Sequence, residues 1–306
     1  MQITATIIPI FLVIFVGWLA RKKQFMPDGF LGPANRLVYY LAIPAMIFRA
    51  ISRASFQDAF NIQVMLITLV CVVAVFLIAG GLASLTAMAR QIRGTFIQCT
   101  FHGNLGYIGF AVAFYYLGDA GLARCAIFAG FISILQNILA VITLQLHIDR
   151  TVEKSPSIII NTRRIMGHPV ILSALGGILV SVAGIQLPAI IDRSLAILSG
   201  MALPLALLLI GASLSFDLLR ARIQGVMAVS LFKLAIMPGL GILLFKLFAI
   251  PAADYLPAFI LIATPTATVS YVMAREMRGD ADFAAAAISG CTLVSAVSYT
   301  IWLNVV

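Results

Sequence analysis

The chain has 306 residues, of which 62% are hydrophobic and 10% are charged, whereas soluble domains carry roughly 45–50% apolar and about 25% charged residues. This composition excludes an ordinary water-soluble globular protein and indicates an all-α polytopic membrane protein. The net charge of +9 comes from basic residues placed in twos and threes between apolar runs, so it indicates membrane orientation and no nucleic-acid partner.

Ten apolar runs follow one another along the chain, each long enough to cross about 30 Å of hydrocarbon as a helix. The first apolar run is followed, and not preceded, by basic residues such as Arg21. We therefore predict that it is a retained span and not a signal peptide. The predicted spans are at about 4–20, 32–50, 62–88, 94–117, 121–146, 168–184, 188–213, 224–248, 255–276 and 281–304.

Basic residues favour one side of the membrane. If the amino terminus is outside, the odd-numbered connections contain most of the 20 Lys and Arg residues. The positive-inside rule then predicts a multi-pass protein of the cell (inner) membrane with both termini extracytoplasmic.

Internal similarity divides the chain into two halves. The segment 118–127, GDAGLARCAI, is identical to 279–288, GDADFAAAAI, at six of ten places. At an offset of 160, three further pairs match: Pro9 and Pro169, Gly17 and Gly177, Pro44 and Pro204. We therefore predict a first five-helix repeat at 1–146, a cytoplasmic linker at 147–167 and a second repeat at 168–306. Because five is odd, the second repeat is inverted, as in many secondary transporters.

Spans four and nine contain helix breakers at corresponding points. Span four carries three glycines within 103–109, and Pro265 in span nine lies 161 residues after Asn104. Unwound backbone at matching places indicates a midplane site, because the N–H groups at half-helix starts attract anions. The alternatives are close helix packing through the glycines and a simple kink at Pro265.

Four motifs carry a resemblance to a known family over nearly the whole chain. They are GNLGYIG at 103–109, HPVILSALGGILVSVAGIQLP at 168–188, MALPLALLLIGASL at 201–214 and TPTATVSYVMAREMRGD at 264–280. The chain resembles the auxin efflux carrier family, the bacterial relatives of the plant PIN-formed carriers, with a bile acid/sodium symporter-like fold.

The resemblance implies two inverted five-helix repeats, with a scaffold from spans 1, 2, 6 and 7 and a mobile core from spans 3–5 and 8–10. It also implies broken crossing helices four and nine, elevator-type alternating access, a homodimer and transport of organic anions. Asn104 matches the family's crossing asparagine, and Pro265 matches its second-repeat proline. Ala111 stands where the family usually has a proline, so the first break rests on glycines alone.

The candidate substrate-binding residues lie at the two breaks or are polar residues in neighbouring spans. They are His102, Gly103, Asn104, Tyr107, Asn137, Lys233, Thr264, Pro265, Thr266 and Thr268. His102 carries a coupling proton, pairs with a carboxylate of the substrate or binds a backbone carbonyl. Lys233 either snorkels to the interface or provides a counter-charge for an anion. Asn137 and its neighbour Gln136 serve as ligands or as hydrogen bonds between helices.

The four cysteines lie in apolar runs without metal-ligand spacing, so no metal site and no cofactor is predicted. All eleven Asp and Glu residues lie in connections or at span ends. The absence of a membrane carboxylate favours uniport, exchange or coupling through His102.

The sequence predicts a secondary-active carrier of small organic anions such as dicarboxylates, monocarboxylates or auxin-like acids. An anion channel is the first alternative. An intramembrane enzyme is the second, with Ser270 or Thr266 meeting His102, but no catalytic motif supports it, and we predict that the chain is not an enzyme.

Overall fold

The computed structural model describes residues 2–54, 60–147 and 169–306. Throughout these ranges the regular structure is helical, as the composition predicts. The predicted linker at 147–167 lies, apart from residue 147, outside the described residues. The chain divides into two compact units, unit 1 with Met1–Ile62, Gly106–Phe131 and Met166–Ser213, and unit 2 with Gln63–Leu105, Ile132–Ile165 and Leu214–Val306.

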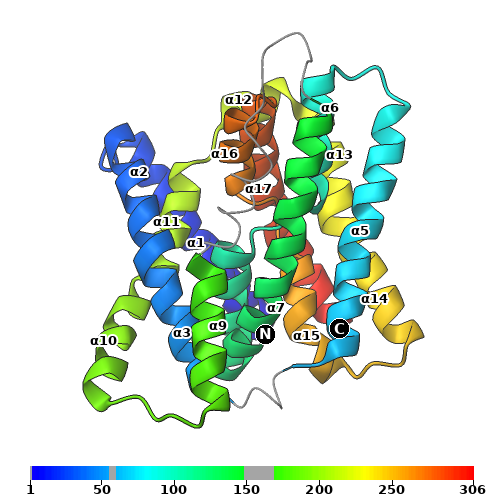
Figure 1. Cartoon of the computed structure of the whole chain (residues 1–306). Helices are drawn as coiled ribbons and strands as arrows, with labels where there is room; N and C mark the ends of the chain where they lie inside the picture. Colours follow the sequence, from blue (N-terminus) through cyan, green and yellow to red (C-terminus); the bar gives the residue numbers. More distant parts are fainter. Residues whose placement is uncertain (1, 55–59, 148–168) are drawn as a thin grey trace. The chain divides into compact units, whose positions relative to one another are not determined.

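Unit 1 is built from the following helices, which can be followed in Figure 1: α1 (Gln2–Lys22), α2 (Asp28–Leu37), the π-helix η1 (Val38–Ala42), α3 (Ile43–Ser52), α9 (Pro169–Val182), α10 (Ala189–Gly200) and α11 (Ala202–Ala212). Two further elements contribute to both units, η2 (Leu105–Gly109) and α7 (Phe110–Leu146). Helix α7 is kinked at Gly118, whose φ of 71° is the left-handed conformation that glycine tolerates.

Unit 2 contains α5 (Ile62–Ser84), α6 (Arg90–Phe101), α12 (Phe216–Ala221), α13 (Ile223–Ser230), η3 (Leu231–Ile236), α14 (Met237–Leu247), α15 (Ala252–Ile262), α16 (Val269–Glu276) and α17 (Ala281–Val305). Helix α17 packs against α6, α12, α13 and α16. The ring of Phe96 on α6 meets that of Phe232 on η3 edge to face, at 6.2 Å between centroids. Buried apolar surface therefore holds α6, η3 and α17 together.

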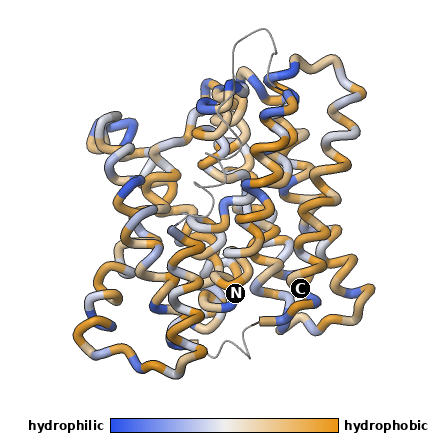
Figure 2. The backbone as a smooth tube through the Cα atoms, in the orientation of Figure 1, coloured by the Kyte–Doolittle hydropathy of each residue, from blue (hydrophilic) through white to orange (hydrophobic). Residues whose placement is uncertain are grey.

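Six helices among the described residues are long and apolar enough to cross a membrane: Ile3–Lys22, Ile62–Ser84, Leu105–Leu146, Ala189–Ala212, Ile223–Leu247 and Ala281–Val305. Helices α9 and α15 are shorter and apolar. Figure 2 shows hydrophobic residues along most of each helix and hydrophilic residues mainly near the ends. Large side chains such as Ile8, Leu179 and Ile197 are exposed, as expected for lipid-facing surfaces. The prediction of a polytopic α-helical membrane protein is confirmed.

Prolines explain two places where α-helix changes to π-helix, one before α3 and one before α14. Pro44 and Pro238 each follow a π-helical turn, η1 and η3, which accommodates the missing N–H group. The carbonyl four residues before Pro238 is that of Leu234, which accepts a hydrogen bond of 2.7 Å from Trp302 Nε1. The polar group that proline leaves unpaired is thus satisfied from α17.

Glycines allow close helix contacts in unit 1. A Cβ atom at Gly17 of α1 would overlap the carbonyl oxygen of Leu208 on α11, and one at Gly211 of α11 would overlap that of Ile14 on α1. Gly177 of α9 similarly lies against α3, where a Cβ would be 3.1 Å from the Phe48 carbonyl oxygen. Small residues permit this approach of backbones, as is common between membrane helices.

Candidate functional site

The two predicted breaks are present, and both belong to unit 2. Helix α6 ends at Phe101 and η2 begins at Leu105, while α15 ends at Ile262 and α16 begins at Val269. Glycine disfavours continuous helix in the first break, and Pro265 lacks the N–H group that would continue the second. We call the two unwound segments, His102–Asn104 and Thr264–Ala267, the crossing.

The two segments of the crossing pair with each other as a short antiparallel bridge between Gly103 and Thr266. The backbone N–H of Asn104 donates to the carbonyl of Pro265 at 2.8 Å, and that of Ala267 donates to the carbonyl of His102 at 2.9 Å. Backbone groups that lie buried away from water must find partners. The two breaks therefore satisfy each other's backbone and fix their relative position.

Side chains satisfy the carbonyl groups that the interrupted helices leave over. At the end of α6, the Cys99 carbonyl accepts a hydrogen bond from Thr266 Oγ1 at 2.9 Å and the Phe101 carbonyl accepts one from Gln136 Nε2 at 3.0 Å. Near the end of α15, the Leu261 carbonyl accepts one from Thr264 Oγ1 at 2.6 Å. Hydroxyl and amide groups thus cap the half-helices from within the crossing and from α7.

Gln136 of α7 bonds to the crossing twice, because its Oε1 also accepts the backbone N–H of Gly103 at 3.3 Å. Its neighbour Asn137 instead donates to the carbonyl of Ser133, one turn earlier in its own helix. The structure therefore brings Gln136, and not the candidate Asn137, to the crossing.

Lys233 lies in η3 and is fully buried, so it does not snorkel to the interface. Its ammonium nitrogen donates to the carbonyl of Ile262 at 2.9 Å and lies 3.4 Å from the sulfur of Met237. A Cβ atom at Gly103 would be 3.2 Å from this nitrogen and would overlap the hydroxyl of Thr264. Gly103 is therefore the residue that allows Lys233 and Thr264 to approach the first break.

The remaining candidates are spread over both units. His102 is buried in unit 2, with its ring parallel to that of Phe101 at 6.3 Å between centroids. Thr268 is half-buried and precedes α16 without capping it through its side chain. Tyr107 belongs to unit 1, where its hydroxyl donates to Asn35 of α2 at 3.1 Å.

Two residues beside the crossing, Gln136 and Ser270, were weighed in the sequence analysis but were not among its candidate substrate-binding residues. Gln136 is nearly fully buried at the first break, and its polar side chain in an apolar run is the signal that marks it. Ser270, on the first turn of α16, is fully buried, and its hydroxyl has no hydrogen-bond partner among the described residues. The four cysteines, all within the described residues, are buried and form no disulfide.

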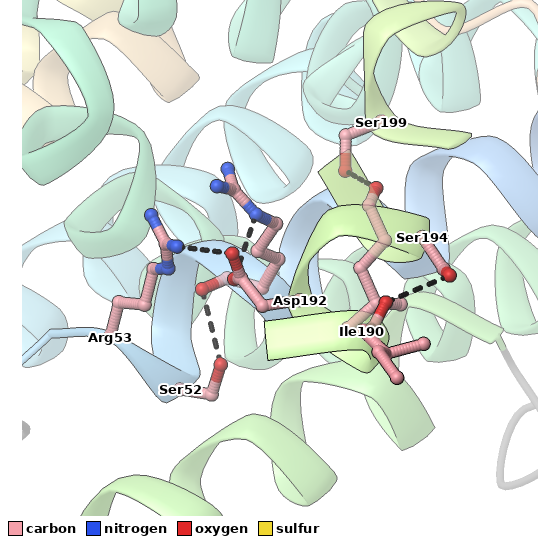
Figure 3. Close-up of polar contacts among 8 residues, drawn as sticks. Ser52, Arg53, Ile190, Asp192, Ser194 and Ser199 are labelled. Atoms are coloured by element: carbon pink, nitrogen blue, oxygen red, sulfur yellow. Dashed lines mark hydrogen bonds and ion pairs between the residues drawn. The ribbon is translucent and has the colours of Figure 1, made fainter. Parts of the chain in front are cut away.

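Two cavities of the described chain are lined by residues of unit 1. A cavity of about 730 Å³ lies beside Ser52, Arg53 and Asp192, and another of about 460 Å³ is lined by Arg49, Arg53 and Asp119 among others. Asp192 of α10 accepts a hydrogen bond from Arg49 Nε of α3 at 3.1 Å and one from Arg53, the residue after α3; Figure 3 shows Arg53 beside Asp192. These ion pairs join α3 and the residue that follows it to α10 in unit 1.

Comparison with known proteins gives one family and several full-length relatives. The family described as "Membrane transport protein" matches residues 2–303. A protein of Rhizobium meliloti named "Putative malonate transporter" is 26% identical over 98% of this chain and 94% of its own length. An "Uncharacterized transporter" of Methanothermobacter thermautotrophicus is 24% identical over 98% of this chain and 97% of its own length.

Proposed function

The chain belongs to the membrane transport protein family, as its auxin efflux carrier motifs predicted, and on this premise we propose that it carries small carboxylate anions that bind at the crossing. It is a membrane transporter, and its family and named relatives are transporters, not enzymes. The observation that carries the proposal is the pairing of two broken helices, Asn104 with Pro265, inside a buried polar site.

Helix termini make the crossing suitable for an anion. Helix α16 starts at Val269, directly after the second break, and its first N–H groups include those of Ser270 and Tyr271, which bond to the carbonyls of Ala267 and Thr268. The positive end of a helix dipole attracts carboxylates, and half-helix starts serve this purpose in transporters. A dicarboxylate such as malonate fits this chemistry, and the name of the Rhizobium meliloti relative agrees with it.

Close contacts in unit 1 support the inverted repeat. Gly17 places α1 against α11, and its repeat-equivalent Gly177 places α9 against α3. In the predicted repeat these helices belong to spans one and seven and to spans six and two. The two pairs are therefore equivalent, which is the relation that two inverted five-helix repeats require.

The two compact units support an elevator-type mechanism. Unit 1 contains the predicted scaffold spans 1, 2, 6 and 7, and unit 2 contains most of the predicted core. The division differs from the prediction at Gly106–Phe131, which falls in unit 1. In the proposed mechanism, unit 2 moves with the bound anion past unit 1. The homodimer and the extracytoplasmic termini stay predictions.

Counterflow in liposomes tests the proposal. Purified protein is reconstituted with internal malonate, lactate or indole-3-acetate, and uptake of the same labelled anion is followed with and without an imposed voltage. We expect saturable exchange of at least one anion, which Asn104→Ala abolishes. Asn304→Ala, which removes an exposed amide near the end of α17, serves as the matched control.

The outcomes separate the possible functions. Saturable exchange that requires Asn104 supports a carrier with its site at the crossing. Anion flux that does not saturate and that appears as single-channel currents would show an anion channel. No flux of any of the three anions would overturn the proposed substrate class.

A further inference from the structure

Lys233 is the one Lys, Arg, Asp or Glu residue among the fully buried side chains of the described chain. It lies in unit 2, where η3 is held against α6 through Phe232 and Phe96. A buried ammonium group away from water is costly unless it is paired with a negative charge. The position of Lys233 at the crossing therefore requires an explanation.

The partners of Lys233 within the described residues do not supply that negative charge. The ammonium group has three donors, of which one bonds to the Ile262 carbonyl and another points to the sulfur of Met237. No carboxylate forms an ion pair with Lys233 in the described part of the chain. On α15 the nearest acidic residue along the helix is Asp254, eight residues before Ile262, which is about 12 Å of helix.

Capping of α15 does not by itself account for a charged residue. The Cys99, Phe101 and Leu261 carbonyls at the same half-helix ends are all capped by neutral side chains, those of Thr266, Gln136 and Thr264. A hydroxyl or an amide would serve the Ile262 carbonyl equally well. The feature that Lys233 adds to the crossing is its positive charge.

We propose that Lys233 is the counter-charge for a carboxylate group of the transported anion, which it binds beside Gly103. This inference rests on the proposed function and names the residue that selects a carboxylate over an uncharged compound of the same shape. Because Gly103 has no side chain, the backbone of the first break lies next to the ammonium group. The carboxylate of the anion takes up the remaining donor of Lys233, so that the two charges neutralise each other in the apolar interior.

Three substitutions separate the charge of Lys233 from its hydrogen bond. Lys233→Arg keeps the charge and the donors, Lys233→Gln keeps a donor without the charge, and Lys233→Met keeps neither. Binding of labelled malonate and of labelled lactate to the purified proteins is measured at equilibrium. Lys246→Gln, which removes an exposed lysine from α14, is the matched control, and a thermal unfolding curve for every variant shows that it is folded.

We expect Lys233→Gln and Lys233→Met to weaken binding of the exchanged anion by about tenfold or more. In both variants the carboxylate of the anion would be buried without a partner of opposite charge. Lys233→Arg retains more binding than either, and Lys246→Gln binds as the wild type does. If folded Lys233→Gln binds the anion within about threefold of the wild type while Lys233→Met does not, the inference is overturned. Lys233 then serves as a cap for α15. Failure of the wild-type protein to bind or exchange either anion would instead contradict the proposed function, so the two failures are distinguishable.

Discussion

Glycines allow close approaches in both units, but the atoms that Gly17 and Gly211 approach differ in kind from those that Gly103 approaches. In unit 1, Gly17 and Gly211 lie against the backbone carbonyls of Leu208 and Ile14, which belong to continuous helices. In unit 2, Gly103 lies against side-chain atoms, the hydroxyl of Thr264 and the ammonium group of Lys233. The first kind of contact joins two helices, whereas the second brings polar groups to an unwound segment.

This difference determines what can yield when a side chain is added. A helix backbone moves only as a whole, so added volume between α1 and α11 must separate the helices or distort them. The side chains of Thr264 and Lys233 can rotate, and the fold can then remain while the polar groups are displaced. Equivalent substitutions in the two units should therefore separate loss of stability from loss of transport.

The largest expected effect is on the α1 to α11 contact. Gly211→Ala places a Cβ in the space of the Ile14 carbonyl, and we expect the free energy of unfolding to fall by about 3 kcal/mol, near the upper end for overpacked cores. Thermal unfolding of the purified protein in detergent measures the change. Gly200→Ala in α10, where nothing lies within 4 Å of the added atom, is the control, and an unchanged melting temperature for Gly211→Ala would contradict the packing.

Next in size is an effect on transport at the crossing. Gly103→Ala displaces Thr264 and Lys233, so we expect anion exchange in liposomes to fall by about tenfold while unfolding changes by about 1–2 kcal/mol. Gly80→Ala in α5, which has open space around it, should leave exchange unchanged. If Gly103→Ala were as unstable as Gly211→Ala, the distinction between the two kinds of glycine contact would be wrong.

The existence of the two breaks could be predicted from the sequence, because their cause is local. Glycines around position 103 and Pro265 disfavour helix wherever they occur, and the internal similarity placed Asn104 and Pro265 at equivalent points. The structure shows these two residues joined by a backbone hydrogen bond of 2.8 Å. The helical class followed from composition in the same way.

The identity of the side chains that reach the breaks could not be predicted. Gln136 and Asn137 are neighbours on α7, and about 100° of helix rotation decides which one faces the crossing. Both lie in a run that is apolar on all sides, so no amphipathic pattern marks the buried face. For Lys233, the choice between snorkelling and burial depends on η3, a π-helical turn whose position relative to α6 is set by packing.

The contrast between Gln136 and Asn137 gives a smaller, paired prediction. Gln136→Leu removes the partners of the Phe101 carbonyl and the Gly103 N–H group, and we expect the loss of both bonds together to cost about 1–2 kcal/mol. Asn137→Leu removes a bond within one helix turn, where we expect less than about 1 kcal/mol. Thermal unfolding of the two variants side by side shows which one loses more stability. A larger loss of stability for Asn137→Leu would show that Gln136 is not the residue that supports the crossing.

The smallest expected effects are on the ion pairs of unit 1. The Arg49 side chain is 23% exposed and that of Arg53 is 55% exposed, so water and salt screen the Arg53 pair with Asp192 more. We expect Arg53→Gln to lower the melting temperature slightly and Arg49→Gln to lower it somewhat more. Both losses should shrink when the melting curves are repeated in high salt. A larger loss for Arg53→Gln than for Arg49→Gln would show that exposure does not govern these pairs.

In unit 1, Asp192 already supplies a carboxylate to its two arginines, so the loss of one arginine leaves the other pair in place. Lys233 has no such partner in the described chain, and for that reason the removal of its charge should act on anion binding where the removal of Arg53 acts only on stability.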